Sequence, residues 1–195
     1  MKKKNILSLF LAGAAMIMPS CMNLDETVYD KLPAEDFGKT EVEINALVGS
    51  VHKTLKKYWP GDFRVLSENG GSMAVTPTRR GGDWYDGGQY REMYTHTWTA
   101  NTSAIKGAWS SASSAIGTCN ATIEVLKNSD VLTDQVKTTK ISEVRGVRAF
   151  WYYAMLDNWG NIPLVTDYND KELPSCKTRQ EVFDWLVAKL RKYRQ

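Results

Sequence analysis

Four segments of the chain carry apolar residues at helical spacing, and this periodicity constrains the fold more than any other feature of the sequence. Apolar positions recur every three or four residues in 40–59, 109–126, 136–159 and 182–190. Such a stripe covers one face of an α-helix and must be buried against another element. Only Ile162 to Val165 is typical of a short extended segment. The sequence therefore predicts an all-α fold of paired amphipathic helices.

The predicted helices have recognisable ends. Thr40 with Glu43, and Thr178 with Glu181, have the spacing of a capping box. Gly160 follows the third helix, where a left-handed cap favours glycine. Paired helices of this kind are what a tetratricopeptide-like array needs, although no 34-residue repeat is visible. The last helix has no stop signal, so we expect a fragment of a longer protein.

The N-terminus is typical of a bacterial lipoprotein signal. Three lysines at positions 2–4 precede 13 mostly apolar residues, Ile6 to Met18. A membrane-spanning helix needs about 20 such residues, whereas the apolar part of a signal peptide has about 7–15. Ser20 directly before Cys21 resembles a lipobox, in which the cysteine becomes the acylated first residue of the mature chain. We expect a signal peptide at 1–20 and palmitate-type lipidation of Cys21; an ordinary secretory signal with a free Cys21 is the alternative.

The domain division follows from this leader. Residues 21–39 are predicted to be an acidic tether, and 40–195 the helical domain. Asp25, Glu26 and Asp30 resemble the acidic signal that follows the lipidated cysteine in surface lipoproteins of Bacteroidetes. Acyl chains stabilise membrane attachment by about 0.8 kcal/mol per buried CH₂, so the anchor needs no spanning helix. Cys119 lies in an apolar helical row and is predicted to be a buried thiol, while its pairing with Cys176 stays open.

Charge and motif content exclude several functions. The chain has 25 Lys and Arg against 22 Asp and Glu, and three of the lysines lie in the predicted leader, so the mature chain is balanced. A neutral body without a basic stripe disfavours nucleic-acid binding. His52 and His96 are the only histidines, and the sequence contains no Cys-x-x-Cys pair. We therefore expect no metal site and no cofactor.

Residues 61–102 differ from the helical segments and form the candidate binding region. Six of the 14 glycines occur there as three pairs, together with five Trp and Tyr residues. A loop this long is usually functional or disordered, and the aromatic residues argue against disorder. Sugar rings stack on aromatic faces, and their hydroxyls need bidentate polar partners. The candidate ligand-binding residues are Arg79, Arg80, Asp83, Trp84 and Tyr85, with Trp84 as the first stacking platform; that Trp84 and Tyr85 instead fold back onto the helices stays open.

Catalysis is disfavoured. Asp83 and Asp86 are the only acids that suggest a glycosidase pair in this segment, but such a pair needs two carboxylates at a fixed separation on a rigid frame. A glycine-rich loop is a poor frame. A Ca²⁺ ion held by the same two acids is an alternative that we favour less. We expect no catalytic residue and no enzymatic activity.

Two consecutive motifs resemble the SusD/RagB family of Bacteroidetes outer-membrane lipoproteins. They are 143–153, EVRGVRAFWYY, and 159–165, WGNIPLV. Members typically carry an Arg-Ala-Phe-Tyr-Tyr helix followed by an aromatic-Gly-Asp-Val-Pro-Leu turn. The matching positions are Arg148, Ala149, Phe150, Tyr152, Gly160, Pro163 and Leu164; Trp109, Ile116 and Asn120 fit the family's spacing on the preceding helix, and the start of the last helix at 179–183 fits as well.

The resemblance implies an incomplete SusD-like scaffold, because family members are much longer and place a large C-terminal region after their tetratricopeptide-like part. Members bind oligosaccharides or other nutrients at the cell surface and deliver them to a SusC-type TonB-dependent transporter in the outer membrane. The resemblance therefore implies nutrient glycan capture by a protein anchored to the cell outer membrane and exposed at the surface. The residues of these motifs are expected to have structural roles: Phe150, Trp151 and Tyr152 are expected in the core, and Arg148 as a buried anchor or a ligand contact.

Three other interpretations of the sequence remain open. The truncated scaffold is compatible with a protein-interaction role alone, or with a non-functional remnant of an interrupted gene. A soluble periplasmic helical adaptor is the third reading. None of these alternatives involves nucleic acid.

Overall fold

The computed structural model describes residues 38–170 and 172–192. The predicted signal peptide, Cys21 and nearly all of the predicted tether lie outside these residues. The described part forms one compact unit that begins at Gly38. Within residues 38–170 and 172–192, no helix is long and apolar enough to cross a membrane.

The structure is predominantly helical, which confirms the predicted all-α fold class. Four long helices coincide with the four periodic segments, and several short helical turns lie between the first two of them. The elements in chain order are α2 (Glu41–Thr54), η2 (Leu55–Lys57), α3 (Asp62–Arg64), the π-helix η3 (Val65–Asn69), η4 (Asp86–Gly88), α4 (Gln89–Tyr94), α5 (Ser103–Lys127), α6 (Asp134–Trp159), β1 (Ile162–Pro163), β2 (Cys176–Lys177) and α7 (Arg179–Lys192).

The helix ends form as the sequence predicts. The Thr40 side chain accepts a hydrogen bond from the Glu43 backbone N–H at 3.2 Å, and the Glu43 carboxylate accepts one from the Thr40 N–H at 3.1 Å. Thr178 and Glu181 make the same reciprocal pair at the start of α7. Gly160 ends α6 with φ +72°, a conformation that favours glycine over residues with a Cβ. Both capping boxes and the glycine cap are confirmed.

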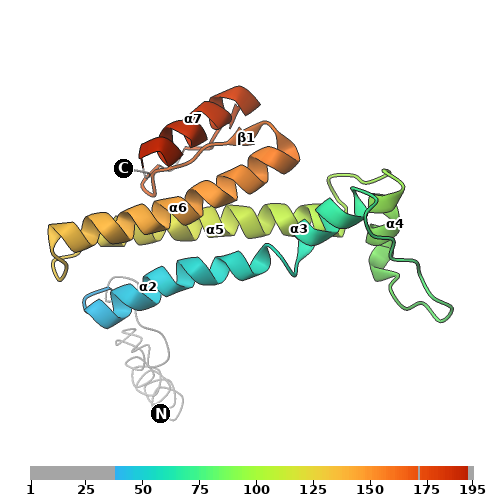
Figure 1. Cartoon of the computed structure of the whole chain (residues 1–195), viewed down its shortest axis with the longest axis horizontal. Helices are drawn as coiled ribbons and strands as arrows, with labels where there is room; N and C mark the ends of the chain where they lie inside the picture. The colour runs from blue at the N-terminus through green and yellow to red at the C-terminus, as the bar shows by residue number, and fades with distance from the viewer. Residues whose placement is uncertain (1–37, 171, 193–195) are drawn as a thin grey trace, which may run out of the picture. The chain divides into compact units, whose positions relative to one another are not determined.

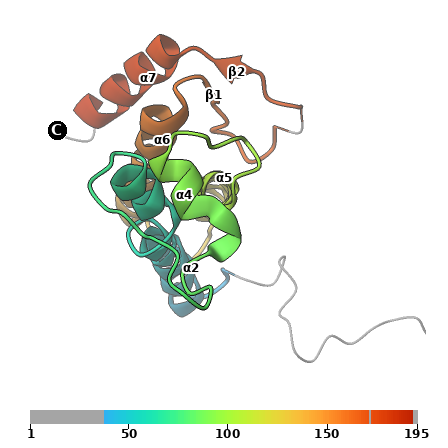
Figure 2. The ribbon, with the colours of Figure 1, turned by 90° about the vertical axis from the view of Figure 1, so that its right-hand side faces the viewer.

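The long helices pack as a layered stack around α5 and α6. These two helices form an antiparallel hairpin with the most extensive contact in the fold; α2 packs against both, and α7 packs against α6 on the other side (Figures 1 and 2). The short strands β1 and β2 pair antiparallel, with Ile162 opposite Lys177, and lead the chain from α6 into α7. The apolar stripes of all four helices meet in one core.

Aromatic residues fill the end of the core from which the 61–102 segment departs. Trp151 is fully buried and donates its indole N–H to the Thr54 hydroxyl at 2.9 Å, which joins α6 to α2. The Tyr58 ring lies 4.9 Å from Phe150 and 5.0 Å from Phe63, measured between ring centroids. Phe63 belongs to α3, so this contact fixes the first turn of the segment on the helical core.

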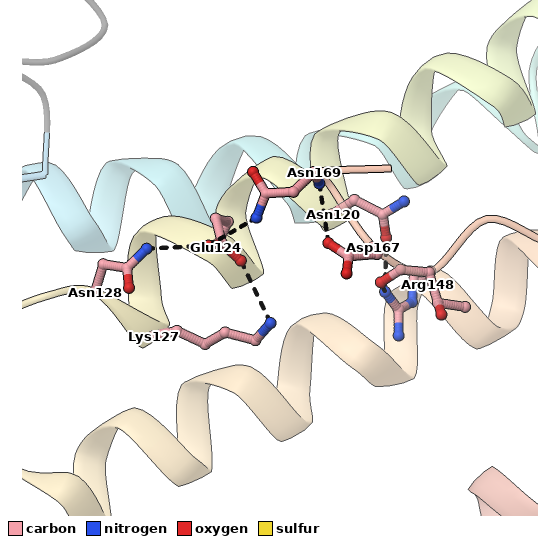
Figure 3. A network of polar contacts seen from close by, with 8 residues as sticks. Asn120, Glu124, Lys127, Asn128, Arg148, Asp167 and Asn169 are labelled. Carbon is pink, nitrogen blue, oxygen red and sulfur yellow. Dashed lines mark hydrogen bonds and ion pairs between the residues drawn. The ribbon is translucent and has the colours of Figure 1, made fainter. Parts of the chain in front are cut away.

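A polar network holds the chain after β1 against α5 and α6 (Figure 3). The buried Arg148 guanidinium donates to the Asn120 side-chain oxygen at 2.6 Å and to the Thr166 carbonyl at 2.9 Å. The Tyr152 hydroxyl donates to the Val165 carbonyl at 2.6 Å. Further along, the Asn169 side chain donates to Glu124 of α5 at 3.1 Å. Arg148 and Tyr152 are thus structural anchors, as the sequence motif suggested for the core positions.

The 61–102 segment and the two cysteines of the helical domain are the remaining points of comparison between the predicted and the observed structure. Residues 61–102 were predicted as a loop without clear periodicity, and this is wrong in part, because α3, η3, η4 and α4 lie there. Helices of three to six residues are too short to show an apolar period. Cys119 is fully buried and Cys176 exposed, and both are free thiols.

Candidate functional site

The 61–102 segment contains a cavity of about 270 Å³ with Trp84 on its wall. The indole is 51% exposed, so it neither folds back into the core nor projects freely into solvent. Guanidinium groups and aromatic rings share the lining, which makes the cavity the candidate ligand site. We call it the Trp84 pocket; its lining residues are Arg64, Val75, Thr76, Pro77, Arg79, Trp84 and Tyr90.

The backbone around Trp84 is folded into tight turns. The Arg79 N–H donates to the Asp83 carbonyl at 3.0 Å, and the Gly82 N–H donates to the Arg79 carbonyl at 3.0 Å. Gly81 and Gly82 have φ of +108° and +94°, which glycine adopts without cost. Trp84 itself has φ +64°. An aromatic residue in the left-handed region is strained by about 1–3 kcal/mol, and such strain concentrates at ligand sites.

Tyr90 forms the second aromatic wall. Its ring meets Trp84 edge to face, with centroids 6.4 Å apart and planes at 62°. Burial, followed by the nearby Asp86 charge, raises the pKa of the Tyr90 phenol. Tyr90 belongs to α4, which follows η4 and its left-handed Gly87 and Gly88. The ring pair therefore depends on a turn that the glycines make possible.

Asn69 of η3 holds the part of the lining that contains Thr76. The buried Asn69 side chain donates to the Ala74 carbonyl at 3.3 Å and to the Thr76 hydroxyl at 3.0 Å. These bonds turn the chain back along η3 and place Thr76 in the lining of the pocket. Arg64 reaches the same cavity from α3 and pairs with Glu68 at 3.2 Å.

The base of the pocket region rests on a close approach between α3 and α5. A Cβ added at Gly107 would lie 2.0 Å from Oδ2 of Asp62, so the Asp62 carboxylate packs against the α5 backbone. Burial raises the pKa of this carboxyl. A residue with a Cβ at position 107 would force the Asp62 side chain to move, whereas the backbone conformation there does not demand glycine.

Of the five residues predicted to bind ligand, the structure brings two to the Trp84 pocket. Arg79 and Trp84 line it, whereas Arg80, Asp83 and Tyr85 are exposed residues outside its lining. The sequence reasoning missed Arg64 and did not assign Tyr90 to the site. Tyr90 was detectable as one of the five aromatic residues of the segment, but nothing in the sequence indicates that α3 carries Arg64 to the same cavity.

A second cavity, of about 490 Å³, borders α4 at Met93. Trp98, which is 41% exposed, and Trp159 line it together with Met93 and Asn158. The Trp98 ring contacts His96 at 5.1 Å between centroids. Polar groups are few here, so this cavity offers apolar faces and little to bind sugar hydroxyls.

A larger groove of about 790 Å³ runs between α6 and α7. Its lining is mainly apolar and includes the half-exposed rings of Tyr153 and Phe183 and the exposed Leu190. Asp157, Arg179 and Gln180 supply its polar groups. Size alone therefore does not identify the sugar site, because a sugar ring needs several polar partners beside an aromatic face.

The potential metal ligands of the described residues do not cluster, and the two histidines contact other side chains. Within residues 38–170 and 172–192, no three His, Cys, Asp or Glu side chains come together as a metal-ligand group. His52 lies 2.6 Å from Glu143, which joins α2 to α6, and His96 packs on Trp98. Both histidines are thus engaged in structural contacts.

Comparison of the sequence with known proteins gives one significant curated relative. The chain is 27% identical over 124 residues to a protein of Bacteroides ovatus named SusD-like protein, covering 61% of this chain and 23% of the relative. No family model matches the sequence.

Comparison of the fold with solved structures finds several similar folds, among them that of a SusD-like protein. A laminarin-binding SusD-like protein has a TM-score of 0.65 at 17% identity, covering 80% of this chain and 34% of its own. A surface glycan-binding protein A from Bacteroides uniformis has a TM-score of 0.65 at 19% identity, covering 79% and 34%. The chain spans about a third of each solved protein and about a quarter of the curated relative.

Proposed function

We propose that this chain, which is SusD-like in sequence and in fold, binds a glycan at the Trp84 pocket and releases it chemically unchanged. Both similar solved proteins carry glycan-binding names, laminarin in one case and surface glycan in the other. The proposal applies that class of ligand to the pocket whose side chains suit it. We infer no catalytic step, and the pocket acts by recognition alone.

The observation that carries the proposal is the combination of groups around Trp84. The half-exposed Trp84 and the Arg79 side chain line the same cavity, with Tyr90 as a second ring. The C–H face of a pyranose stacks on an indole, and its hydroxyls accept from a guanidinium. Turns at both ends of 79–90 preorganise these groups, which lowers the entropic cost of binding.

The free energy of stacking limits the affinity that this pocket alone can provide. If stacking on Trp84 hides about 100 Å² of apolar surface, it contributes about 2.5 kcal/mol at about 25 cal/mol per Å². Micromolar affinity needs about 8 kcal/mol. We therefore expect weak binding by the pocket alone, and additional platforms in a complete binding protein.

The cellular role is the second part of the proposal. The lipobox-like Ser20-Cys21 and the acidic residues after it support a lipid anchor in the outer membrane with the domain at the cell surface. In that position the chain would hand its glycan to a SusC-type TonB-dependent transporter. Radioactive palmitate should label the wild-type protein but not the Cys21→Ala variant; equal labelling of both would refute the anchor.

Affinity electrophoresis tests the binding site. The protein migrates through native gels that contain soluble glycans, and retardation relative to a glycan-free gel measures binding. Trp84→Ala should lose retardation, whereas Trp59→Ala should keep it, because Trp59 is 64% exposed and lies outside the pocket. Equal retardation of the Trp84→Ala variant and the wild type would remove Trp84 from the site.

A mere scaffold or remnant would show no retardation by any glycan. The electrophoresis therefore separates the proposed function from the alternative of a protein-interaction role alone.

A further inference from the structure

The Trp84 pocket has an unbalanced charge. Arg64 and Arg79 belong to its lining, and no Asp or Glu does. The chain as a whole is close to neutral, with 25 basic and 22 acidic residues, so the imbalance is local to the pocket. A site for neutral sugars generally mixes donors and acceptors, because every hydroxyl both donates and accepts. Guanidinium groups only donate.

The two arginines differ in their availability. Arg64 donates to the Glu68 carboxylate at 3.2 Å, so part of its charge is compensated within the protein. The Arg79 side chain makes no hydrogen bond or ion pair with any residue in 38–170 or 172–192. Its backbone, in contrast, is fixed by bonds to Asp83 and Gly82. Arg79 is thus an uncompensated cation on a fixed turn.

The acids near the pocket lie outside its lining. Asp86 is near enough to Tyr90 to raise the pKa of the phenol, but it does not line the cavity. The Asp62 carboxylate packs against Gly107 of α5. Asp83 lies outside the lining and contributes its backbone carbonyl to the turn. None of these three carboxylates therefore belongs to the lining that contains Arg64 and Arg79.

We infer that the Trp84 pocket selects an anionic sugar, one whose ring bears a carboxylate or a sulfate. The ring stacks on Trp84 while two oxygens of its carboxylate or sulfate accept from the Arg79 guanidinium in a bidentate pair. Arg64 adds a second, weaker donor. This inference rests on the proposed function, since it assigns the substrate class of the same pocket.

Matched glycans test the inference. Calorimetric titration of the full chain, purified in detergent, compares an oligogalacturonide with the same oligomer after reduction of its carboxyl groups to neutral hydroxymethyls. A charge-assisted hydrogen bond at a partly exposed site should give at least a tenfold preference for the acidic oligomer. The preference should shrink between 0.05 and about 0.5 M NaCl as the charges are screened. A sulfated oligosaccharide in a third arm distinguishes the two oxyanion sources.

Two variants locate the effect. Arg79→Gln should reduce the preference to less than threefold, because it weakens binding of the acidic oligomer far more than binding of the neutral one. Arg91→Gln removes the same charge from α4, outside the pocket lining, and should keep the preference. Circular dichroism melting of each variant verifies that the fold is retained.

The outcomes separate this inference from the proposed function. Equal affinity for acidic and neutral oligomers, with both dependent on Trp84, overturns the anionic selectivity and leaves glycan binding in place. A preference that persists in Arg79→Gln places the anion elsewhere and also overturns the inference. Absence of Trp84-dependent binding to the acidic, neutral and sulfated oligomers overturns both.

Discussion

Replacement of Gly107 by alanine should reveal how tightly α3, the start of the binding segment, is seated on α5. The new Cβ would lie 2.0 Å from Oδ2 and 2.6 Å from Cγ of Asp62. Ordinary carbon contacts are about 3.5–4.0 Å. The Asp62 side chain must therefore move by more than about an ångström or carry α3 with it, and Phe63 beside it is packed among Tyr58 and Trp151.

Two opposing contributions determine how Gly107→Ala changes the free energy of unfolding. Overpacking at a constrained contact costs about 1–3 kcal/mol. Alanine inside a helix is favoured over glycine by about 1 kcal/mol, because it loses less backbone freedom on folding. Gly107→Ala alone should therefore lower the free energy of unfolding by up to about 2 kcal/mol. In an Asp62→Ala background the clash is gone, and the same substitution should raise the free energy of unfolding by about 1 kcal/mol.

Urea unfolding of the four proteins, followed by circular dichroism, gives the double-mutant cycle. We expect a coupling free energy of about 1–3 kcal/mol and a change of sign between the two backgrounds. Equal effects of Gly107→Ala in both backgrounds would refute the contact between Asp62 and α5. Gly117→Ala on the same helix is the control, because a Cβ there meets no atom within 4 Å and should simply stabilise.

Three further predictions follow from buried polar groups. Because burial raises the folded-state pKa of Asp62, its charge opposes folding above that pKa and is lost by protonation below it; Asp62→Asn should thus be more stable than wild type near pH 7, with the difference shrinking as the pH falls toward about 4, and a pH-independent difference in urea midpoints would contradict this. Arg148→Met should lower the free energy of unfolding by about 3 kcal/mol, since it leaves the Asn120 and Thr166 acceptors without their charged donor, and a urea midpoint like that of the wild type would show that the bonds add nothing. In a Cys21→Ala background, iodoacetamide should label Cys176 only, because burial raises the pKa of the Cys119 thiol to about 12; labelling of Cys119 without denaturant, detected by mass spectrometry, would contradict its burial.

The helical framework was predictable because its signals are local. A capping box joins residues three positions apart, so Thr40 with Glu43 can be recognised without knowledge of the fold. The helices α5 and α6 have 25 and 26 residues, enough for the period of their apolar stripes to be clear. The family motif was predictable for the same reason, since its anchors lie within one helix and the following turn.

The short helices of the binding segment were not predictable because tertiary contacts define them. The three residues of α3 are fixed by Phe63 in the aromatic core and by Asp62 against α5. Nothing in the sequence indicates that the Asp62 carboxylate occupies the space beside Gly107. A short segment with no period of its own takes the conformation that its neighbours impose.

The candidate site was predictable in part. Arg79 and Trp84 lie five residues apart, so sequence proximity was enough to group them. Proximity failed for Arg80, Asp83 and Tyr85, because successive positions in a turn with left-handed residues point in different directions. It also failed for Arg64, which approaches from α3 only because Asn69 turns the chain back on itself.

The most direct test of the account follows the tryptophan indole N–H signals by ¹⁵N–¹H NMR during titration with acidic and neutral oligosaccharides. The Trp84 signal, assigned by its loss in Trp84→Phe, should shift and saturate, while the Trp151 signal, whose N–H is buried and bonded to Thr54, should stay fixed. Shifts confined to Trp98 and Trp159, or no saturable shift of any indole, would contradict glycan binding at the Trp84 pocket.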